Sequence, residues 1–175
     1  MRMWPIVAAA ILAGAGAAQG QELRAEMYLI TPGAADQPIG YVLITSGGSG
    51  TKFVADLHGL PPGQHGFHVH DTGNCGPGPN AAGAIAPRMA AGGHYDPEQT
   101  GVHRGPEGNG HLGDLPFLTV QADGRGIGEA FAARIKDASQ LKGRALVLHA
   151  NSDNYSDMPA PDGGGGDRIA CGIIQ

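Results

Sequence analysis

The sequence has no basic run, no apolar segment long enough to be a good membrane span, and little helical periodicity. Its 11 Lys and Arg residues are scattered among 16 Asp and Glu residues, so the chain lacks the basic tract that follows a nucleic-acid backbone. The apolar run near the N-terminus, IVAAAILAGAGAA, is shorter than the roughly 20 residues that cross a bilayer. These absences argue against nucleic-acid binding and against stable association with a membrane.

The first residues are typical of an export signal. A positive charge in MRMWP precedes the apolar run, and small residues follow it up to Gly20, which is the order found in a secretory signal peptide. We expect residues 1–20 to be removed and residues 21–175 to form one domain, because 175 residues suit a single core. Removal of Arg2 leaves 10 basic against 16 acidic residues, a charge of −6 with neutral histidines. A membrane-anchoring helix is the alternative for this segment.

Cysteine is also scarce, since Cys75 and Cys171 are the only two. An exported protein enters an oxidising compartment, where the two thiols are expected to form a disulfide that closes a long loop. Two separate buried thiols are the alternative.

Glycine and proline are abundant, with 31 and 13 residues, but their distribution argues against disorder. Turn signals separate short apolar or alternating segments of strand length. The predicted strands are 23–30, 39–44, 51–57, 117–121, 145–150 and 168–174. This pattern predicts an all-β antiparallel sandwich or barrel, with one short helical turn within 136–143.

Two long stretches, 71–115 and 151–167, show little strand pattern. Loops of this length in a compact domain are usually functional or disordered. Because these two carry most of the remaining histidines and many acids, we interpret them as functional loops.

Seven side chains could bind metal ions. His68 and His70 in GFHVH share one face of a strand, while Phe67 and Val69 face the core. The other donors are His94, His103, His111, Asp114 and His149. Imidazole and carboxylate together suit zinc, and an all-imidazole set with an open position suits copper or a catalytic zinc. Two four-coordinate ions need eight donors, so one histidine would have to be shared. Taken singly, each donor could be an ordinary polar residue.

Five segments closely resemble the copper/zinc superoxide dismutase family in its bacterial exported form. They are GFHVH, GGHYDP, TGVHRGPEGNGHLGDLP, LVLHANSDNYSD and GGGGDRIACGII, in the family's order from about Leu60 to the C-terminus. The resemblance implies an eight-stranded antiparallel Greek-key sandwich or flattened barrel with two long functional loops. It also implies a periplasmic location, a monomer or homodimer, and one copper and one zinc per subunit.

The resemblance also implies a role for individual residues. The implied copper ligands are His68, His70, His94 and His149, and the implied zinc ligands are His94, His103, His111 and Asp114. Asp153 would hydrogen-bond ligand histidines of both sites, and Cys75 and Cys171 would form the family's disulfide. Arg168 would border the copper and attract the superoxide anion, and His94 would carry a proton. The implied reaction is dismutation of superoxide to dioxygen and hydrogen peroxide, in which copper exchanges the electron because zinc has no redox chemistry.

Two other function classes use some of the same residues. A noncatalytic exported protein for copper or zinc storage or delivery would need the ligands but not Arg168. A zinc hydrolase is suggested by HVHD, but its HxHxDH pattern breaks after Asp71, where Thr72 and Gly73 follow.

Four further basic or histidine residues need an interpretation. We expect His58 to be a surface residue and His65 to hydrogen-bond backbone near the copper strand without binding metal. Arg88 and Arg104 on the first long loop are candidates for the field that attracts an anion, and solvated loop charges are the alternative.

Overall fold

The computed structural model describes residues 22–30 and 35–175, so the expected signal peptide lies outside the described residues. The strands are β1 (Glu22–Leu29), β2 (Gln37–Gly47), β3 (Gly50–Leu57), β4 (Gly63–His65), β5 (Phe67–His70), β6 (Gly78–Pro79), β7 (Ile85–Ala86), β8 (Leu118–Val120), β9 (Gly126–Ala132), β10 (Ala145–His149) and β11 (Arg168–Ile173). Three short 3-10 helices are η1 (Met89–Ala91), η2 (Ala138–Leu141) and η3 (Asp162–Gly164). Among the described residues, no helix is long and apolar enough to cross a membrane.

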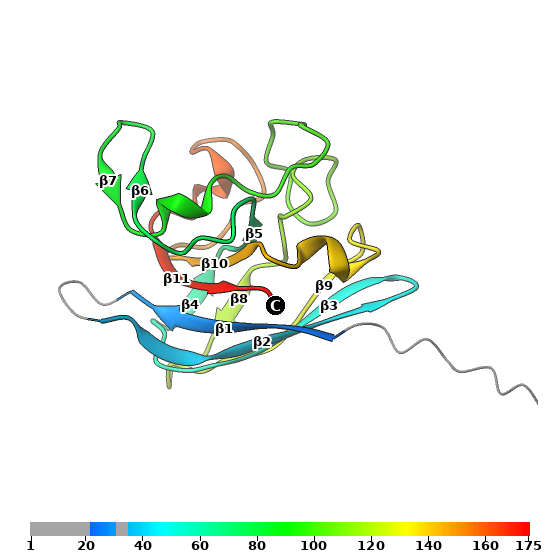
Figure 1. Ribbon diagram of the computed structural model, residues 1–175, viewed down its shortest axis with the longest axis horizontal. Coiled ribbons are helices and arrows are strands. Elements are labelled where there is room, and N and C mark those ends of the chain that lie inside the picture. The colour runs from blue at the N-terminus through cyan, green and yellow to red at the C-terminus, as the bar shows by residue number, and fades with distance from the viewer. Residues whose placement is uncertain (1–21, 31–34) are drawn as a thin grey trace, which may run out of the picture.

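The main sheet has seven antiparallel strands in the order β5-β10-β11-β1-β2-β3-β9. A second pair, β4 and β8, connects its two edges. β4 leads into β5 across Gly66, and β8 leads into β9 through a tight turn in which the Gln121 amide donates to the Arg125 carbonyl. If β4 and β5 are counted as one interrupted strand, eight strands form a curled, flattened barrel (Figure 1). The predicted all-β class is confirmed.

The alternation of side chains explains how the strands build the core. Along β1, Leu23, Ala25 and Met27 are buried, while the residues between them are exposed, as expected for a strand with one face in the core. On β5, Phe67 and Val69 join the main apolar cluster, and Phe67 packs edge-on against Phe53 with ring centroids 6.1 Å apart. These contacts direct the alternate residues of β5, the two histidines, away from the core.

The sequence patterns missed one long strand, β9, whose sequence is GIGEAFA. Its small residues Ala130 and Ala132 face the core, while Ile127 and Phe131 point outward and are each 46% exposed. On β9 the small side chains face the core and the large apolar ones face solvent, which is the reverse of an ordinary half-buried strand. A Cβ atom at Gly126 would lie 3.1 Å from Leu118 Cδ2, so the close approach of β8 favours this small residue.

The two long loops lie on the same side of the barrel, above β5 and β10 in Figure 1. The first contains only β6, β7 and η1 as regular elements, and the second contains only η3. The predicted helical turn is confirmed as η2, whose N-terminus is capped by Asp137 Oδ1 accepting from the Ser139 amide at 2.8 Å.

The expected disulfide joins Cys75 of the first long loop to Cys171 of β11, with 5.8 Å between the Cα atoms and a sequence separation of 96. Cys171 packs beside Ala145 and Val147 of β10. The disulfide therefore fastens the loop to the centre of the sheet.

Replacing both cysteines by alanine should lower the free energy of unfolding by about 2 to 5 kcal/mol, because the bridge restricts the unfolded chain over a loop of roughly 100 residues. Thermal and denaturant unfolding of the two proteins at equal metal content would measure the difference. The wild type under reducing conditions is the matched control and should resemble the variant. Equal midpoints for the oxidised wild type and the variant would contradict this expectation.

Candidate metal centre

Four buried histidines form the first cluster of candidate ligands. His68 and His70 come from β5, His149 ends β10 at a β-bulge, and His94 lies on the first long loop, paired with His70 by an isolated bridge. One ring nitrogen of each lies within 4.8 Å of the corresponding nitrogen of every other. None of the four is more than 6% exposed.

Hydrogen bonds fix which nitrogen of each ring carries the proton. His70 Nδ1 donates to the Gly92 carbonyl at 3.0 Å and His149 Nδ1 donates to the Gly166 carbonyl at 3.2 Å, so both Nε2 atoms keep their lone pairs. These two Nε2 atoms lie 3.4 Å apart. Because each ring carries its proton on Nδ1, the two Nε2 atoms cannot hydrogen-bond each other. Their lone pairs repel unless a cation binds both.

His68 has the opposite arrangement. Its Nε2 donates to Asp153 Oδ2 at 2.7 Å, and its Nδ1 is buried without a hydrogen-bond partner. A buried polar atom without a partner is costly, and a metal ion would satisfy it. The donor set, nitrogen from imidazole only, fits copper.

Burial keeps these rings neutral. It lowers the pKa of His70 and of His149 well below the ordinary value, and nearby His94 and Arg168 act in the same direction. Burial, together with His94, lowers the pKa of His68 to about 4. All three rings are therefore available as neutral ligands at pH 7.

The second cluster lies within the first long loop and contains His94, His103, His111 and Asp114, again with ligand atoms within 4.8 Å of one another. The Asp114 carboxylate is central, with His94 Nδ1 2.9 Å from Oδ1 and His103 Nδ1 3.0 Å from Oδ2. The Nδ1 atoms of His103 and His111 are buried without hydrogen-bond partners. Three imidazoles and one carboxylate suit a four-coordinate zinc ion.

His94 belongs to both clusters. Its ring centroid lies 4.0 Å from that of His68 on one side and 5.4 Å from that of His111 on the other. Because Nδ1 faces Asp114, Nε2 is the nitrogen left for the first cluster. Two four-coordinate ions need eight donor atoms from seven side chains. The two nitrogens of the His94 ring are placed to supply the additional one.

The charge state of the second cluster differs from that of the first. Burial lowers the pKa of His103, but the neighbouring carboxylates of Asp114 and Asp153 outweigh it and raise the pKa to about 10. The nearby Asp114 carboxylate raises the pKa of His111. Burial would raise the pKa of the Asp114 carboxyl, but its histidine partners hold it far below the usual range.

Asp153, in the second long loop, contacts one histidine of each cluster. Its Oδ2 accepts from His68 Nε2, and its Oδ1 accepts from His103 Nε2 at 2.8 Å and from the Tyr155 amide at 2.7 Å. A carboxylate in this position sets the orientation and basicity of both rings. The adjacent Gly163 has φ +75°, and a Cβ there would overlap Asp153 Oδ1, so only glycine fits against this carboxylate.

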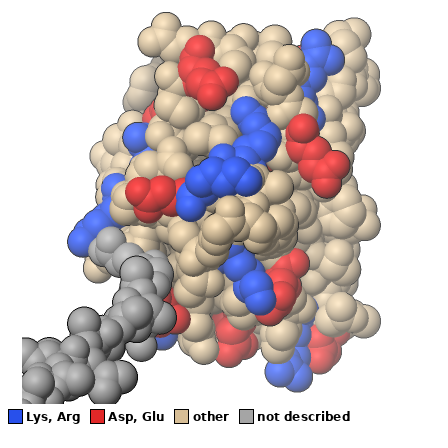
Figure 2. All heavy atoms as spheres, turned by 90° about the vertical axis from the view of Figure 1, so that its right-hand side faces the viewer, with Lys and Arg blue, Asp and Glu red and all other residues tan. Residues whose placement is uncertain are grey.

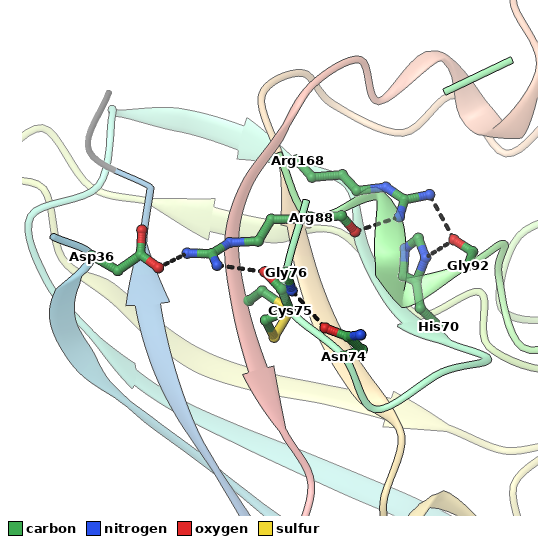
Figure 3. Close-up of a disulfide and its surroundings, with 9 residues drawn as sticks. Asp36, His70, Asn74, Cys75, Gly76, Arg88, Gly92 and Arg168 are labelled. Atoms are coloured by element: carbon green, nitrogen blue, oxygen red, sulfur yellow. Dashed lines mark hydrogen bonds and ion pairs between the residues drawn. A yellow bond between two sulfur atoms is a disulfide. The ribbon is translucent and has the colours of Figure 1, made fainter. Parts of the chain in front are cut away.

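A cleft of about 900 Å³ opens beside the first cluster, and its lining includes His94, His149 and Arg168. Arg168 begins β11, opposite His149 in the strand register. Its guanidinium donates to the Arg88 carbonyl at 2.8 Å and to the Gly92 carbonyl at 2.7 Å (Figure 3). The cleft therefore combines one positive charge with histidines of the first cluster.

The remaining histidines behave as predicted. His58 is exposed. His65 is buried with Nδ1 2.8 Å from the His149 carbonyl and Nε2 2.8 Å from the Pro61 carbonyl, which confirms its backbone-bonding role.

The two loop arginines differ from each other. Arg104 is exposed, as expected of a loop charge. The interpretation of Arg88 as a solvated loop charge is wrong, because it is only 8% exposed and ion-paired with Asp36. Sequence spacing contains no signal for this pairing, which joins residues 52 positions apart. A contribution of Arg88 to the field that attracts an anion stays a prediction. Elsewhere on the surface, basic side chains on the face shown in Figure 2 are interspersed with acidic ones.

The part of the chain that matches known proteins includes every residue of both clusters. The family model for copper/zinc superoxide dismutase (SODC) matches residues 39–174. A Cu-Zn superoxide dismutase of Escherichia coli (strain K12) is 45% identical over 175 residues, which is 100% of both chains. The structure of Cu/Zn superoxide dismutase from Brucella abortus matches with a TM-score of 0.84 and 44% identity, over 89% of this chain and 100% of that one. The monomeric copper, zinc superoxide dismutase from Salmonella enterica matches with a TM-score of 0.76 and 46% identity, at the same coverage.

Zinc binding to the metal-free protein should release protons at pH 7. The pKa of about 10 means that His103 carries a proton at pH 7 which the metal must displace, so we expect about one proton released per zinc and an affinity that falls as pH falls. Calorimetric titration in two buffers of different ionisation enthalpy measures this number. The His149→Ala variant keeps all four side chains of the second cluster, so zinc binding to it should release the same number of protons. Zinc binding without proton release would contradict the assigned charge states.

Proposed function

The chain belongs to the copper/zinc superoxide dismutase family, and we propose how its own residues convert superoxide into dioxygen and hydrogen peroxide. Copper and zinc are the cofactors. The proposed copper ligands are His68, His70, His94 and His149, and the proposed zinc ligands are His94, His103, His111 and Asp114. The observation that carries the proposal is the position of His94 between a cluster of imidazole lone pairs and a carboxylate-centred cluster.

The chemistry requires an electron carrier, a proton carrier and a site for an anion. Copper, when bound, accepts and returns one electron, whereas zinc has no redox chemistry. Two superoxide ions and two protons give one dioxygen and one hydrogen peroxide. His94 Nε2 is proposed to hold one of the two protons and to transfer it to the second superoxide, and the cleft admits the other proton from water.

Zinc-site residues support this role of His94 by holding its ring. Because Nδ1 is directed to the Asp114 side of the centre, the ring keeps its place when Nε2 takes up a proton. Asp153 stabilises the arrangement from the other side, since its contacts to His68 and His103 fix both rings.

Arg168 is proposed to attract and orient superoxide in the cleft. The mature chain is negative overall, so an anion is drawn by the local field rather than by net charge, and the handling of superoxide by this enzyme class is a known example of such steering. The Arg168 guanidinium donates to two carbonyls and forms no ion pair with a carboxylate among residues 22–30 and 35–175. A noncatalytic storage or delivery protein would have no use for such a cation, and that alternative is not favoured.

The protein's processing and assembly are part of the same proposal. We infer that residues 1–20 are a cleaved signal peptide, that residues 21–175 form the dismutase domain in the periplasm, and that the mature protein is a monomer or homodimer. The disulfide supports an oxidising compartment. The negative charge and single basic residues give no support for nucleic-acid binding.

The direct test is to load purified residues 21–175 with copper and zinc and to follow superoxide decay optically. The loaded protein should remove superoxide far faster than the metal-free protein, and zinc alone should not restore the activity. If the protein loaded with both metals is no faster than the metal-free protein, the proposed function is wrong.

His149→Ala should lose copper and activity while retaining much of the zinc, because His149 contributes a lone pair to the first cluster only. Metal analysis after chelator competition, together with the superoxide assay, measures both effects. His58→Ala is the matched control, since His58 is an exposed imidazole and its replacement should leave both metals bound. Equal copper content in the two variants would remove His149 from the ligand set.

A further inference from the structure

Arg88 is a buried cation whose side chain connects three separate parts of the molecule. It lies on the first long loop immediately before η1. Its Nη1 donates to the Cys75 carbonyl at the disulfide, and its Nη2 forms an ion pair with Asp36, which directly precedes β2 (Figure 3). Nine-tenths of the Arg88 side chain is buried, and that of Asp36 is 39% exposed.

The main chain of Arg88 contacts the cleft. Its carbonyl oxygen accepts from Arg168 Nη1 at 2.8 Å, and the Gly92 carbonyl, just beyond the other end of η1, accepts from Arg168 Nη2 at 2.7 Å. Gly92 also accepts from His70 Nδ1. The short helix η1 therefore holds the guanidinium of Arg168 between the carbonyls that flank it, one of which also orients a proposed copper ligand.

The backbone of Arg88 needs this anchoring. Its φ of 60° lies in the left-handed region, which is unfavourable for a residue with a Cβ and persists only where the surroundings impose it. The Cys75 carbonyl and the Asp36 carboxylate hold its side chain, while η1 and Arg168 engage its carbonyl. Among the described residues, this carbonyl of Cys75 and this carboxylate are the polar contacts of the Arg88 guanidinium, and its Nε has no hydrogen-bond partner.

We propose that Arg88 is a positioning residue for the anion site: by fastening η1 to the disulfide and to Asp36, it sets the orientation of the Arg168 guanidinium in the cleft. This proposal rests on the proposed function for the role of Arg168. It assigns Arg88 no contact with superoxide. Because Asp36 offsets its positive charge, Arg88 acts through geometry rather than through its own field.

Four variants separate geometry from charge. Arg88→Met keeps much of the apolar stem and removes both side-chain contacts, while lowering the net charge by one unit. The double variant Asp36→Asn/Arg88→Met removes the same contacts and restores the original net charge. Asp36→Asn alone keeps the bond to the Cys75 carbonyl, and Arg88→Lys keeps the charge but not the forked geometry of a guanidinium.

Three measurements follow each variant at verified copper, zinc and disulfide content. The first is kcat/KM for superoxide, and the second is the affinity of azide for the copper(II) protein, which reports anion binding without turnover. The third is the rate of water exchange of the Arg168 Nε proton by NMR in the diamagnetic copper(I), zinc protein. Arg168→Lys identifies that resonance by its loss.

Arg88→Met and the double variant should both lose about three- to tenfold in kcat/KM and in azide affinity, the range expected when a binding side chain loses one good hydrogen bond. Exchange of the Arg168 proton should accelerate in both. Asp36→Asn should show a smaller loss, and Arg88→Lys should recover part of it. Where Arg88→Met fails to retain both metals, Arg88→Lys provides the same comparison with the wild type.

Two results would overturn the proposal. Recovery of wild-type azide affinity in the double variant would show that Arg88 acts through net charge. Unchanged azide affinity and unchanged Arg168 proton exchange in Arg88→Met would show that the orientation of Arg168 does not depend on it. The proposed function fails separately, through absence of dismutation by the loaded wild type, because azide binding and proton exchange do not require turnover.

Discussion

The position of one imidazole ring, that of His94, is the constraint on which the rest of the centre depends. Its Nδ1 faces the carboxylate of Asp114, and its Nε2 remains for the cluster formed by His68, His70 and His149. A ring with both nitrogens committed has no rotational freedom, so elements on either side must be placed to within a fraction of an ångström. A loop could not do this by itself. The loop is held by strand β5 on one side and by the disulfide to β11 on the other.

Two backbone carbonyls and one carboxylate set the tautomers of His68, His70 and His149, the proposed copper ligands. Gly92 and Gly166 each accept from an Nδ1 atom, whereas the carboxylate of Asp153 accepts from an Nε2 atom. The three rings consequently direct different nitrogens toward the same point. Burial then keeps the pKa of each ring below its ordinary value, so the lone pairs stay available. Ligand geometry and ligand charge state thus have a common origin in how deeply the loops cover β5.

The loops that cover β5 also hold a positively charged side chain, that of Arg168, at the cleft. Arg168 starts the strand that carries Cys171, and the carbonyls that flank η1 accept from its guanidinium. Arg88 joins η1 to the disulfide and to Asp36. The Cys75–Cys171 disulfide, the buried Arg88 and the half-buried Arg168 are therefore connected by hydrogen bonds beside the cleft. Because the net charge of the protein has the same sign as the superoxide anion, the position of the Arg168 charge matters more for anion binding than the net charge does.

The sequence by itself determined the strand segments with ordinary alternation, the orientation of Phe67 and Val69 toward the core, the cysteine pairing and the set of candidate donor residues. These depend on local periodicity or on residue types that few other positions supply. Residue types and spacing left open which histidine is shared. The family resemblance implied His94, and the tertiary structure shows that ring between the clusters, because its position depends on contacts across loops. Only the tertiary structure revealed β9, whose large residues face outward, and the burial of Arg88, whose partners Asp36 and Cys75 come from distant segments. The physical reason is the same in each case. Histidine tautomers, ion pairs and the side of a strand that faces the core depend on residues that are neighbours in space, and such neighbours produce no periodic pattern in the sequence.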